Sequence, residues 1–268
     1  MQTDADLREN PEGAALRWLQ RQVASNRFLP APPPELQFVG DGDFRAIGAE
    51  FLGRFVRAGL RPDHRVLDIG CGVGRMAVPL TQFLSPQGGY DGVDIVEAGI
   101  AWCRTAIGAV YGNFRFHHLD LRHPLYNPAG APAAEPVRLA FPDAGFDFAI
   151  MTSVITHLRA AEVVAYAGEL GRLLRPGGRA LVSLFLMNGR AREHIRRTAP
   201  RLRFDPDAPG PEFHAFPDAP LAAVAYDEDF IIATFERSGL RRARPTEYGH
   251  WCGRAAETFQ DICVFERS

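Results

Sequence analysis

Three glycines at alternate positions, Gly70, Gly72 and Gly74, directly follow a short apolar run. Glycine accepts positive backbone angles, and without side chains a ligand can approach the main chain closely. Asp68 stands at the entrance to this turn, where its carboxylate would repel a pyrophosphate and attract an ammonium group. Asp94 ends the next apolar run, and a carboxylate there can accept hydrogen bonds from both hydroxyls of a ribose. The pattern indicates a site for a nucleoside that carries a positive charge.

Two classes of cofactor use such a glycine turn. Dinucleotide-binding folds favour the spacing G-x-G-x-x-G, which places a pyrophosphate on the terminus of the following helix. Here Arg75 occupies the place of the third glycine. A ligand with a ribose, an adenine and a positively charged amino acid fits better, and S-adenosylmethionine is such a ligand. An NAD-dependent oxidoreductase that uses the same strand, turn and helix stays open as an alternative.

The elements that must position these residues are predicted from short apolar runs that alternate with amphipathic stretches. The predicted strands span residues 65–69, 90–95, 114–119, 146–152, 179–186 and 259–265. The predicted helices that alternate with them span residues 75–84, 97–107, 160–174 and 227–238. Because strands and helices alternate, we predict an α/β fold with a parallel sheet that is covered on both faces.

Two regions lie outside this alternation. Residues 1–42 are predicted to form an N-terminal helical arm, with a helix over 14–23, and a proline-rich linker. Residues 43–268 are predicted to form the main domain, which begins with a helix over 43–58. Residues 189–226, after the fifth strand, hold several prolines and aromatic residues without clear periodicity. Because so long a loop is usually a lid or a disordered segment, we predict a lid insertion there.

The segment 68–74 (D-x-G-x-G-x-G), with Asp94 and Asp120 at the ends of the next two predicted strands, resembles the class I S-adenosylmethionine-dependent methyltransferases. Residues 173–179 resemble the family's turn into the fifth strand. Residues 153–158 resemble the segment after the fourth strand in a bacterial branch that acts on small molecules and glycans. The resemblance implies a Rossmann-like, doubly wound sheet of seven strands in the order 3-2-1-4-5-7-6, with strand 7 antiparallel. It also implies a ligand crevice at the carboxyl ends of the parallel strands.

The resemblance further implies which residues bind the cofactor. Those of the glycine turn hold the methionine moiety, those after the second strand hold the ribose and adenine, and those after the third strand hold the edge of the adenine. Those at the end of the fourth strand lie beneath the sulfonium. The residues of the glycine turn are Asp68, Gly70, Cys71, Gly72 and Gly74. Asp94 and Ile95 follow the second strand, Asp120 and Leu121 follow the third, and Thr152 and Ser153 lie at the end of the fourth.

Histidines near the expected crevice are candidates for a general base. A base is useful only if the acceptor is a hydroxyl, which must lose its proton. His157, just past the fourth strand, is the leading candidate, and the alternative is that it orders the turn. His250, before the last strand, is the second candidate.

Aromatic residues beside histidines are candidates for the acceptor pocket. Tyr248 and Trp251 flank His250, and such rings suit stacking on a sugar or a planar acceptor, although they could equally form a plug at the edge of the sheet. Phe213 and His214 lie in the predicted lid, which would exclude water from the reaction. The alternative is that His214 is a loop residue in solvent.

Composition excludes several other chemistries. The 268 residues carry a net charge of −2, from 30 basic and 32 acidic residues, so no nucleic-acid partner is expected. All basic residues are arginine, which excludes a Schiff-base lysine. The four cysteines lie too far apart for a CxxC pair, and no metal site is predicted. The sequence shows neither a secretory signal nor an apolar run long enough for a membrane span, so the predicted location is cytoplasmic.

These features predict methyl transfer from S-adenosylmethionine to a small-molecule or glycan acceptor by in-line displacement. A hydroxyl acceptor is favoured because the fourth strand is followed by Ser153-Val154-Ile155-Thr156 rather than by an Asn-Pro-Pro-Tyr-type segment, which is typical of methylation at base nitrogens. A catalytically silent partner subunit that binds the cofactor is the alternative from a different functional class.

Overall fold

The computed structural model describes residues 11–37, 42–132, 137–198 and 200–268. The chain forms two compact units. The first unit contains Met1–His64 and Cys71–His118, and the second contains Arg65–Gly70 and Leu119–Ser268. The boundary between the two units therefore falls within the glycine turn, because Gly70 ends a segment of the second unit and Cys71 begins a segment of the first.

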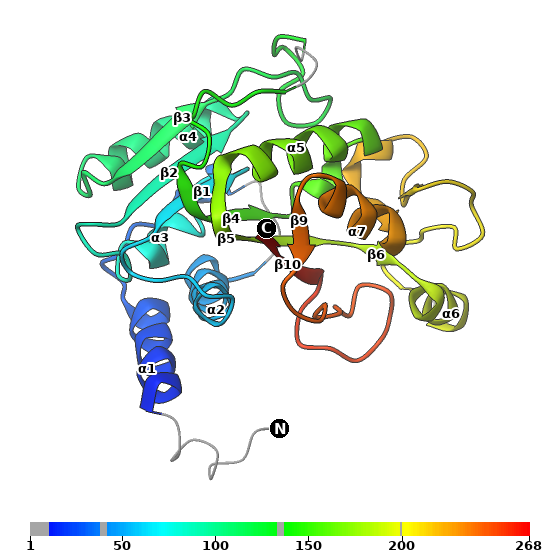
Figure 1. Cartoon of the computed structure of the whole chain (residues 1–268), viewed down its shortest axis with the longest axis horizontal. Helices are drawn as coiled ribbons and strands as arrows, with labels where there is room; N and C mark the ends of the chain where they lie inside the picture. Colours follow the sequence, from blue (N-terminus) through cyan, green and yellow to red (C-terminus); the bar gives the residue numbers. More distant parts are fainter. Residues whose placement is uncertain (1–10, 38–41, 133–136, 199) are drawn as a thin grey trace. The chain divides into compact units, whose positions relative to one another are not determined.

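The first unit is mainly helical, with two strands of the main sheet. Its elements are α1 (Pro11–Ser25), η1 (Pro34–Leu36), α2 (Phe44–Arg57), α3 (Ala77–Leu80), β2 (Gly89–Asp94), α4 (Glu97–Cys103), η2 (Arg104–Gly108) and β3 (Phe114–His118) (Figure 1). Gln20 on α1 donates a hydrogen bond from Nε2 to the Ala49 carbonyl on α2 at 2.9 Å. Gly53 makes room for it, because a Cβ there would lie 2.3 Å from Gln20 Nε2. This contact joins the N-terminal helix to α2.

The second unit contains the remaining strands. Its sheet strands are β1 (Arg65–Ile69), β4 (Phe146–Thr152), β5 (Leu174–Leu184), β6 (Leu186–Met187), β7 (Glu212–His214), β8 (Val224–Asp227), β9 (Leu240–Arg242) and β10 (Asp261–Arg267). Its helices are η3 (Ile155–His157), α5 (Ala160–Leu173), α6 (Gly189–Thr198), η4 (Pro220–Ala222) and α7 (Glu228–Arg237). Asp227 begins α7 by accepting hydrogen bonds from the Asp229 and Phe230 amides, at 3.1 and 3.3 Å.

The main sheet has seven strands in the order β3-β2-β1-β4-β5-β10-β9. Strand β2 is parallel to β3, and both β1 and β5 are parallel to β4. Strand β10 is antiparallel to both of its neighbours, β5 and β9. The predicted Rossmann-like sheet with its antiparallel strand is confirmed. Strands β9 and β10 occupy the places of strands 6 and 7 in the expected order.

The helix after the glycine turn is shorter than predicted. A helix was expected over residues 75–84, whereas α3 spans only Ala77–Leu80. The Thr81 hydroxyl donates to the Val78 carbonyl at 2.7 Å, and the Ser85 amide donates to the Pro62 carbonyl at 2.8 Å. These hydrogen bonds pair backbone groups outside the regular helical pattern, so the helix ends at Leu80.

Residues 189–226, for which no regular element was predicted, contain α6, β7, η4 and β8. Strands β6, β8 and β7 form a second sheet in that order. Buried side chains from this segment share one hydrophobic cluster with side chains on either side of it in the sequence. Its buried members are Phe185, Met187, Ala191, Ile195, Phe204, Phe213, Ala215, Ala223, Ala225, Trp251 and Cys252.

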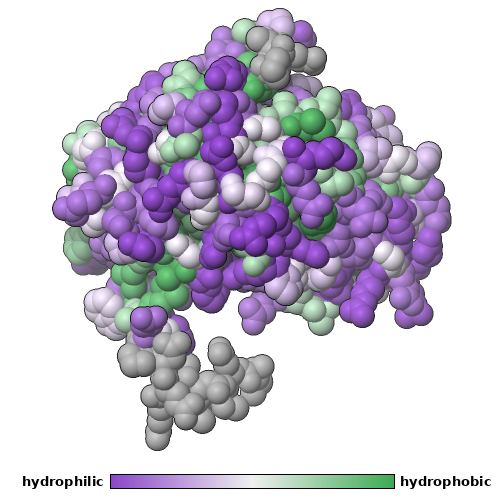
Figure 2. Space-filling model, viewed as in Figure 1, coloured by the Kyte–Doolittle hydropathy of each residue, from purple (hydrophilic) through white to green (hydrophobic). Residues whose placement is uncertain are grey.

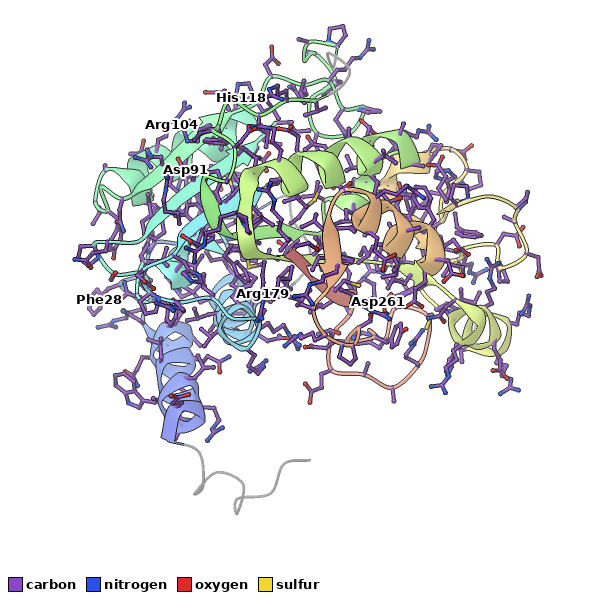
Figure 3. The ribbon with its side chains drawn as sticks, in the orientation of Figure 1. Phe28, Asp91, Arg104, His118, Arg179 and Asp261 are labelled. Carbon is purple, nitrogen blue, oxygen red and sulfur yellow. The ribbon has the colours of Figure 1, made fainter. Side chains whose placement is uncertain are left out.

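A buried carboxylate, Asp261, fixes the start of β10 (Figure 3). Its Oδ2 accepts hydrogen bonds from the Leu186 amide and from Trp251 Nε1, and its Oδ1 accepts one from the Gly249 amide, all at 2.7 Å. All three partners are donors, which matches a carboxylate. Burial nevertheless raises the pKa of Asp261 to about 6, although these donors favour the charged form.

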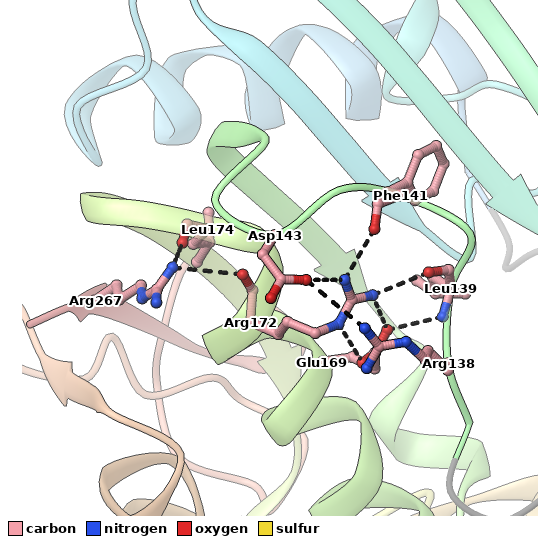
Figure 4. A network of polar contacts seen from close by, with 8 residues as sticks. All are labelled: Arg138, Leu139, Phe141, Asp143, Glu169, Arg172, Leu174 and Arg267. Atoms are coloured by element: carbon pink, nitrogen blue, oxygen red, sulfur yellow. Dashed lines mark hydrogen bonds and ion pairs between the residues drawn. The ribbon is translucent and has the colours of Figure 1, made fainter.

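A second polar network holds α5 to the segment that precedes β4 (Figure 4). The Arg172 guanidinium forms ion pairs with Glu169 at 2.6 Å and Asp143 at 2.7 Å. It also donates to the carbonyls of Leu139 and Phe141, at 2.9 and 2.8 Å. Arg172 therefore connects the segment between β3 and β4 to α5, the helix that covers β5.

Figure 2 shows a face on which hydrophilic residues predominate and hydrophobic residues form small patches. Among the larger exposed apolar side chains, Trp18 and Phe28 expose 57% and 84% of their surface. Within the described part of the chain, no helix has the length and apolar character needed to cross a membrane.

We expect Asp261→Asn to destabilise the fold by an amount that depends on pH. The amide nitrogen of Asn would face a donor, which costs about 1–3 kcal/mol. Because the pKa of Asp261 is raised in the folded state, its contribution to the free energy of unfolding falls as the pH rises from about 4 to about 6, by about 3 kcal/mol. The stability difference between the two proteins should therefore be largest at low pH.

Urea unfolding at several pH values between 4.5 and 7.5 measures this difference. Asp218→Asn is the matched control, because Asp218 is exposed and lies in the same unit. A stability difference that stays constant over this range would contradict the assignment of a raised pKa to Asp261.

Candidate functional site

The start of the glycine turn lies in the second unit. Asp68 is fully buried on β1, and Gly70 follows the strand with a φ of +75°. A Cβ at Gly70 would lie 2.2 Å from Cγ2 of Val154, in the segment that follows β4. Gly70 is therefore required both by its backbone angle and by the close approach of the segment after β4.

The rest of the turn lies in the first unit. Gly72 and Gly74 have φ angles of +56° and +73°, and Cys71, directly before Gly72, is buried. A Cβ at Gly74 would lie 2.7 Å from Cδ1 of Ile107. The main chain of the turn thus stays free of side chains, while its glycines allow the following helices to pack against it.

Asp94 joins the end of β2 to this part of the turn. Its Oδ2 accepts a hydrogen bond from the Gly72 amide at 2.7 Å, and its Oδ1 accepts one from the Val96 amide at 2.8 Å. Burial raises the pKa of Asp94, and the backbone donors oppose this shift. A carboxylate has about four acceptor positions, so both oxygens keep capacity for the hydroxyls of a ribose.

The residues expected at the adenine are held by neighbouring polar groups. In the first unit, the Ile95 carbonyl accepts a hydrogen bond from His118 Nε2 at 3.2 Å. In the second unit, Asn127 Nδ2 donates to Asp120 Oδ1 at 3.2 Å and to the Leu121 carbonyl at 3.1 Å. His118 and Asn127 were not predicted, because no motif in the sequence links them to these partners.

A polar cluster gathers at the ends of β4 and β5. Ser153, directly after Thr152 at the end of β4, has a φ of +61°, which is uncommon for a residue other than glycine. The Ser153 amide donates to Ser183 Oγ at 2.9 Å. The hydroxyls of both serines donate to Gln260 Oε1, at 3.1 and 2.5 Å. Strained residues of this kind concentrate at functional sites, where neighbouring contacts hold them in place. Sequence reasoning missed Ser183 and Gln260, which are distant in sequence from Ser153.

His157 lies in the turn after β4 with both ring nitrogens engaged. Its Nδ1 donates to the Leu221 carbonyl at 2.9 Å, and its Nε2 accepts from the Tyr126 hydroxyl at 3.2 Å. Burial lowers the pKa of His157, so the neutral form is favoured. The structure therefore presents a neutral imidazole whose proton is fixed on Nδ1.

Tyr126 was not predicted as a site residue. Its ring stacks on His123 at a centroid distance of 5.1 Å, and His123 Nε2 donates to the His157 carbonyl at 2.9 Å. The only sequence feature that points to Tyr126 is its place three residues after His123, in an otherwise proline- and alanine-rich stretch. The role arises from contacts between segments that are far apart in the chain.

The predicted acceptor residues lie in different environments. Trp251 and Phe213 are each 1% exposed and belong to the hydrophobic cluster of the second unit. His214 Nδ1 donates to the Pro220 carbonyl at 3.0 Å, so His214 and His157 both hold η4. The structure thus brings His157 and His214 to one element.

The remaining predicted acceptor residues precede β10. The Tyr248 hydroxyl donates to Glu228 Oε1 at 2.7 Å, and burial together with this carboxylate raises the pKa of Tyr248 to about 12. His250 is exposed and contacts the ring of Phe259 edge-on at 5.4 Å. In the described residues, no group of three or more His, Cys, Asp or Glu side chains is placed to hold a metal ion.

The geometry of the glycine turn and its acids agrees with comparisons to known proteins. A family model described as "Methyltransferase domain" matches residues 42–215, which is more than half of the chain. The chain belongs to the class I S-adenosylmethionine-dependent methyltransferases.

Relatives of this methyltransferase include enzymes named for transfer to oxygen. It is 30% identical over 143 residues to nocamycin O-methyltransferase from Saccharothrix syringae, covering 52% of this chain and 45% of that protein. It is 28% identical over 166 residues to ubiquinone biosynthesis O-methyltransferase from Roseobacter denitrificans, covering 58% of this chain and 59% of that protein. The chain thus spans about half the length of these curated relatives.

A solved structure shares the fold of this methyltransferase. The magnesium protoporphyrin IX methyltransferase of Synechocystis, solved with bound S-adenosylhomocysteine, superposes with a TM-score of 0.54 at 21% identity. The match covers 85% of this chain and 90% of that one.

The residues of this methyltransferase fit the family's cofactor. The turn has no side chain at Gly70, Gly72 or Gly74, and a Cβ at Gly70 would fill space that Val154 already occupies. Asp68 and Asp94 are buried carboxylates beside the turn in their respective units. A side-chain-free turn with adjacent acids suits a cationic amino acid attached to a ribose.

We expect Gly70→Ala to lower both the stability of this methyltransferase and its affinity for S-adenosylhomocysteine. The new methyl group would meet Val154, and its φ of +75° strains a residue with a Cβ, which together should cost about 1–3 kcal/mol. Thermal unfolding measures the stability, and isothermal titration calorimetry measures the affinity.

Two further variants separate the causes. Gly168→Ala is the matched control, because Gly168 lies in α5 with open space around its Cβ position, so this change should stabilise by about 0.5–1 kcal/mol. In Gly70→Ala/Val154→Ala the steric clash is removed, and only the cost of the backbone angle should remain. Unchanged binding in Gly70→Ala would argue against a close approach of the cofactor to this residue.

Proposed function

We propose that this methyltransferase transfers the methyl group of S-adenosylmethionine to a hydroxyl of a small-molecule or glycan acceptor. The observation that carries the proposal is the neutral His157 imidazole in the turn after β4, which accepts a hydrogen bond from Tyr126. A hydroxyl acceptor makes use of such a base, because its proton must be removed as the new bond forms. The names of the two O-methyltransferase relatives support the same acceptor class.

The cofactor-binding residues are assigned by their place in each unit. In the second unit, Asp68 and the Gly70 main chain would hold the amino acid end, and Asp120 and Leu121 would hold the edge of the adenine. Thr152 and Ser153 of the same unit would lie beneath the sulfur.

In the first unit, Cys71, Gly72 and Gly74 would contact the methionine moiety, Asp94 would bind the ribose, and Ile95 would pack on the adenine. When bound, S-adenosylmethionine supplies an electrophilic methyl group on a positively charged sulfur.

His157 would act as the base. The Leu221 carbonyl keeps the proton on Nδ1, so the lone pair on Nε2 is the basic position. Because the Tyr126 hydroxyl donates to Nε2, the acceptor proton would reach His157 either by displacing Tyr126 or through its hydroxyl oxygen. In either route the proton ends on Nε2, and the imidazolium forms with its Nδ1–H still on Leu221.

The acceptor side would be shaped by the segments that hold η4 and precede β10. His214, Tyr248 and His250 have solvent access and would contact the acceptor, with His250 as a second candidate base. Phe213 and Trp251 would shape the pocket from within the hydrophobic cluster. Residues 189–226 would form the lid of a methyltransferase domain over 43–268, and residues 1–42 the N-terminal arm.

The test has two parts. Isothermal titration calorimetry with S-adenosylhomocysteine and with NADH asks which cofactor binds, and we expect binding of the first alone. Labelled S-adenosylmethionine with a panel of phenols, hydroxylated polyketides and oligosaccharides then asks which hydroxyl is methylated. Transfer only to amine compounds would contradict the proposal, and binding without transfer to any acceptor or host extract would support the silent-subunit alternative.

On the best acceptor of that panel, we expect His157→Gln to lower kcat about 10²–10⁴-fold, because a positioned base contributes that much. Tyr126→Phe should lower it less, and both variants should bind S-adenosylhomocysteine as the wild type does. Tyr111→Phe is the matched control, because Tyr111 also forms a side-chain hydrogen bond through its hydroxyl, with Gln82 in the first unit. Unchanged kcat in His157→Gln would leave the residue with a structural role only.

A further inference from the structure

The side-chain amide of Gln260 is held by two serine hydroxyls in the second unit. The hydroxyl of Ser183 lies 2.5 Å from Gln260 Oε1, and that of Ser153 lies 3.1 Å from the same oxygen. A separation of 2.5 Å is typical of O–H···O bonds and too short for N–H···O bonds, so the atom facing Ser183 is the amide oxygen. Ser183 Oγ accepts from the Ser153 amide at 2.9 Å, which leaves its own proton for Gln260. These contacts fix which end of the amide faces the serines.

The same contacts leave the amide nitrogen of Gln260 available to a ligand. The carbonyl oxygen of an amide has two lone pairs, and the two hydroxyls occupy both of them. Nε2 carries two N–H donors, and among the residues that the structure describes it has no hydrogen-bond partner. Because Gln260 is partly exposed, a molecule in solution can reach these donors.

Gln260 lies at the end of the sheet where a ligand is expected. It directly precedes β10, whose first residue, Asp261, pairs with Leu184 at the end of β5. In a doubly wound sheet, ligands bind outside the carboxyl ends of the parallel strands, and β4 and β5 both end here. Ser153, which contacts Gln260, is one of the residues expected beneath the sulfur of the cofactor.

The serine that contacts Gln260 also belongs to the turn that carries the proposed base. The Ser153 carbonyl accepts a hydrogen bond from the Thr156 hydroxyl at 2.8 Å, and His157 is the next residue. Ser153 has a φ of +61°, and a strained angle of this kind persists only when neighbouring contacts hold it. Because Gln260 and His157 are both anchored to this turn, we expect one acceptor to contact both.

A group that offers only N–H donors selects its partner by the partner's oxygen atoms. A carbonyl oxygen accepts such bonds without bringing a proton of its own. A hydroxyl in the same place would need an acceptor for its own proton, and the two serines already occupy Gln260 Oε1. An apolar group in the same place would leave the donors unpaired, which a polar binding site disfavours. The chemistry of Nε2 therefore favours a carbonyl oxygen.

We propose that Gln260 is a specificity-determining residue, which donates from Nε2 to a carbonyl oxygen next to the acceptor hydroxyl that is methylated. The favoured acceptors are therefore compounds such as aryl ketones with an ortho hydroxyl. Ser153 and Ser183 are positioning residues, because they hold the amide with its nitrogen available to the acceptor. The inference rests on the proposed function, since it requires methyl transfer to a hydroxyl.

The experiment uses two acceptors that differ in this carbonyl, ortho-hydroxyacetophenone and ortho-ethylphenol, with the full chain and labelled S-adenosylmethionine. The measured quantity is the ratio of kcat/KM for the ketone to kcat/KM for the ethyl compound. Dividing the ratio of a variant by that of the wild type cancels the intrinsic reactivity of the two acceptors. We expect Gln260→Met, which removes the donors without adding charge, to lower the ratio about three- to tenfold, the size of one hydrogen bond.

A second variant keeps the contacts to the serines. Gln260→Glu retains an oxygen that can accept from both hydroxyls and replaces only the NH₂ group, so it should lower the ratio at least as much as Gln260→Met. The change should appear mainly in KM, because the bond is present in both the ground state and the transition state. Both variants should bind S-adenosylhomocysteine as the wild type does in calorimetry.

Gln82→Glu is the matched control. Gln82 is an exposed residue of the first unit, and its amide also contacts two hydroxyls, those of Thr81 and Tyr111, at 3.0 and 3.2 Å. This variant should keep the ratio of the wild type. An equal loss of kcat/KM for both acceptors in the two Gln260 variants would indicate a structural role and overturn the inference. A loss of S-adenosylhomocysteine affinity with an unchanged ratio would also overturn it.

The outcomes for the wild type separate this inference from the proposed function. Transfer to the hydroxyls of other phenols or of oligosaccharides, but not to ortho-hydroxyacetophenone, would overturn the inference and leave the proposed function intact. Transfer to no hydroxyl compound would overturn the proposed function, and this inference with it.

Discussion

The hydrogen bond between the Asp94 carboxylate and the Gly72 amide is the interaction on which the rest of this site depends. The bond is formed at a residue with a left-handed backbone, since Gly72 has a φ of +56°. It also uses a carboxylate that burial tends to protonate, so the neighbouring backbone donors and His118 must keep it charged. Backbone conformation and charge state are therefore linked at one contact.

In the second unit, the corresponding constraint is the turn after β4. Ser153 adopts a strained angle, and its contacts to Ser183 and Gln260 hold it there. Four residues later, His157 is fixed by Leu221 and Tyr126. The segment thus passes from the end of a strand to a half-buried imidazole within one turn, and its polar partners come from four other segments. Such over-determined geometry is what preorganised chemistry requires.

The sequence predicted well those features that local patterns encode. The strands at 65–69 and 146–152 have the predicted bounds, because apolar runs end there at residues that break strands. The elements of 189–226 could not be predicted, because their buried side chains face a cluster completed by Phe185 and Trp251. His118, Tyr126 and Gln260 were missed for a related reason, since each acquires its role from a partner that only the fold brings near.

Two histidines hold η4 through neighbouring backbone carbonyls. His214 donates to the Pro220 carbonyl and His157 to the next carbonyl, that of Leu221. The loop that carries these carbonyls therefore decides which nitrogen of His157 is basic. A change in this loop that moves the Leu221 carbonyl would remove the acceptor that holds the proton on Nδ1. The conformation of this loop and the tautomer of His157 are therefore coupled.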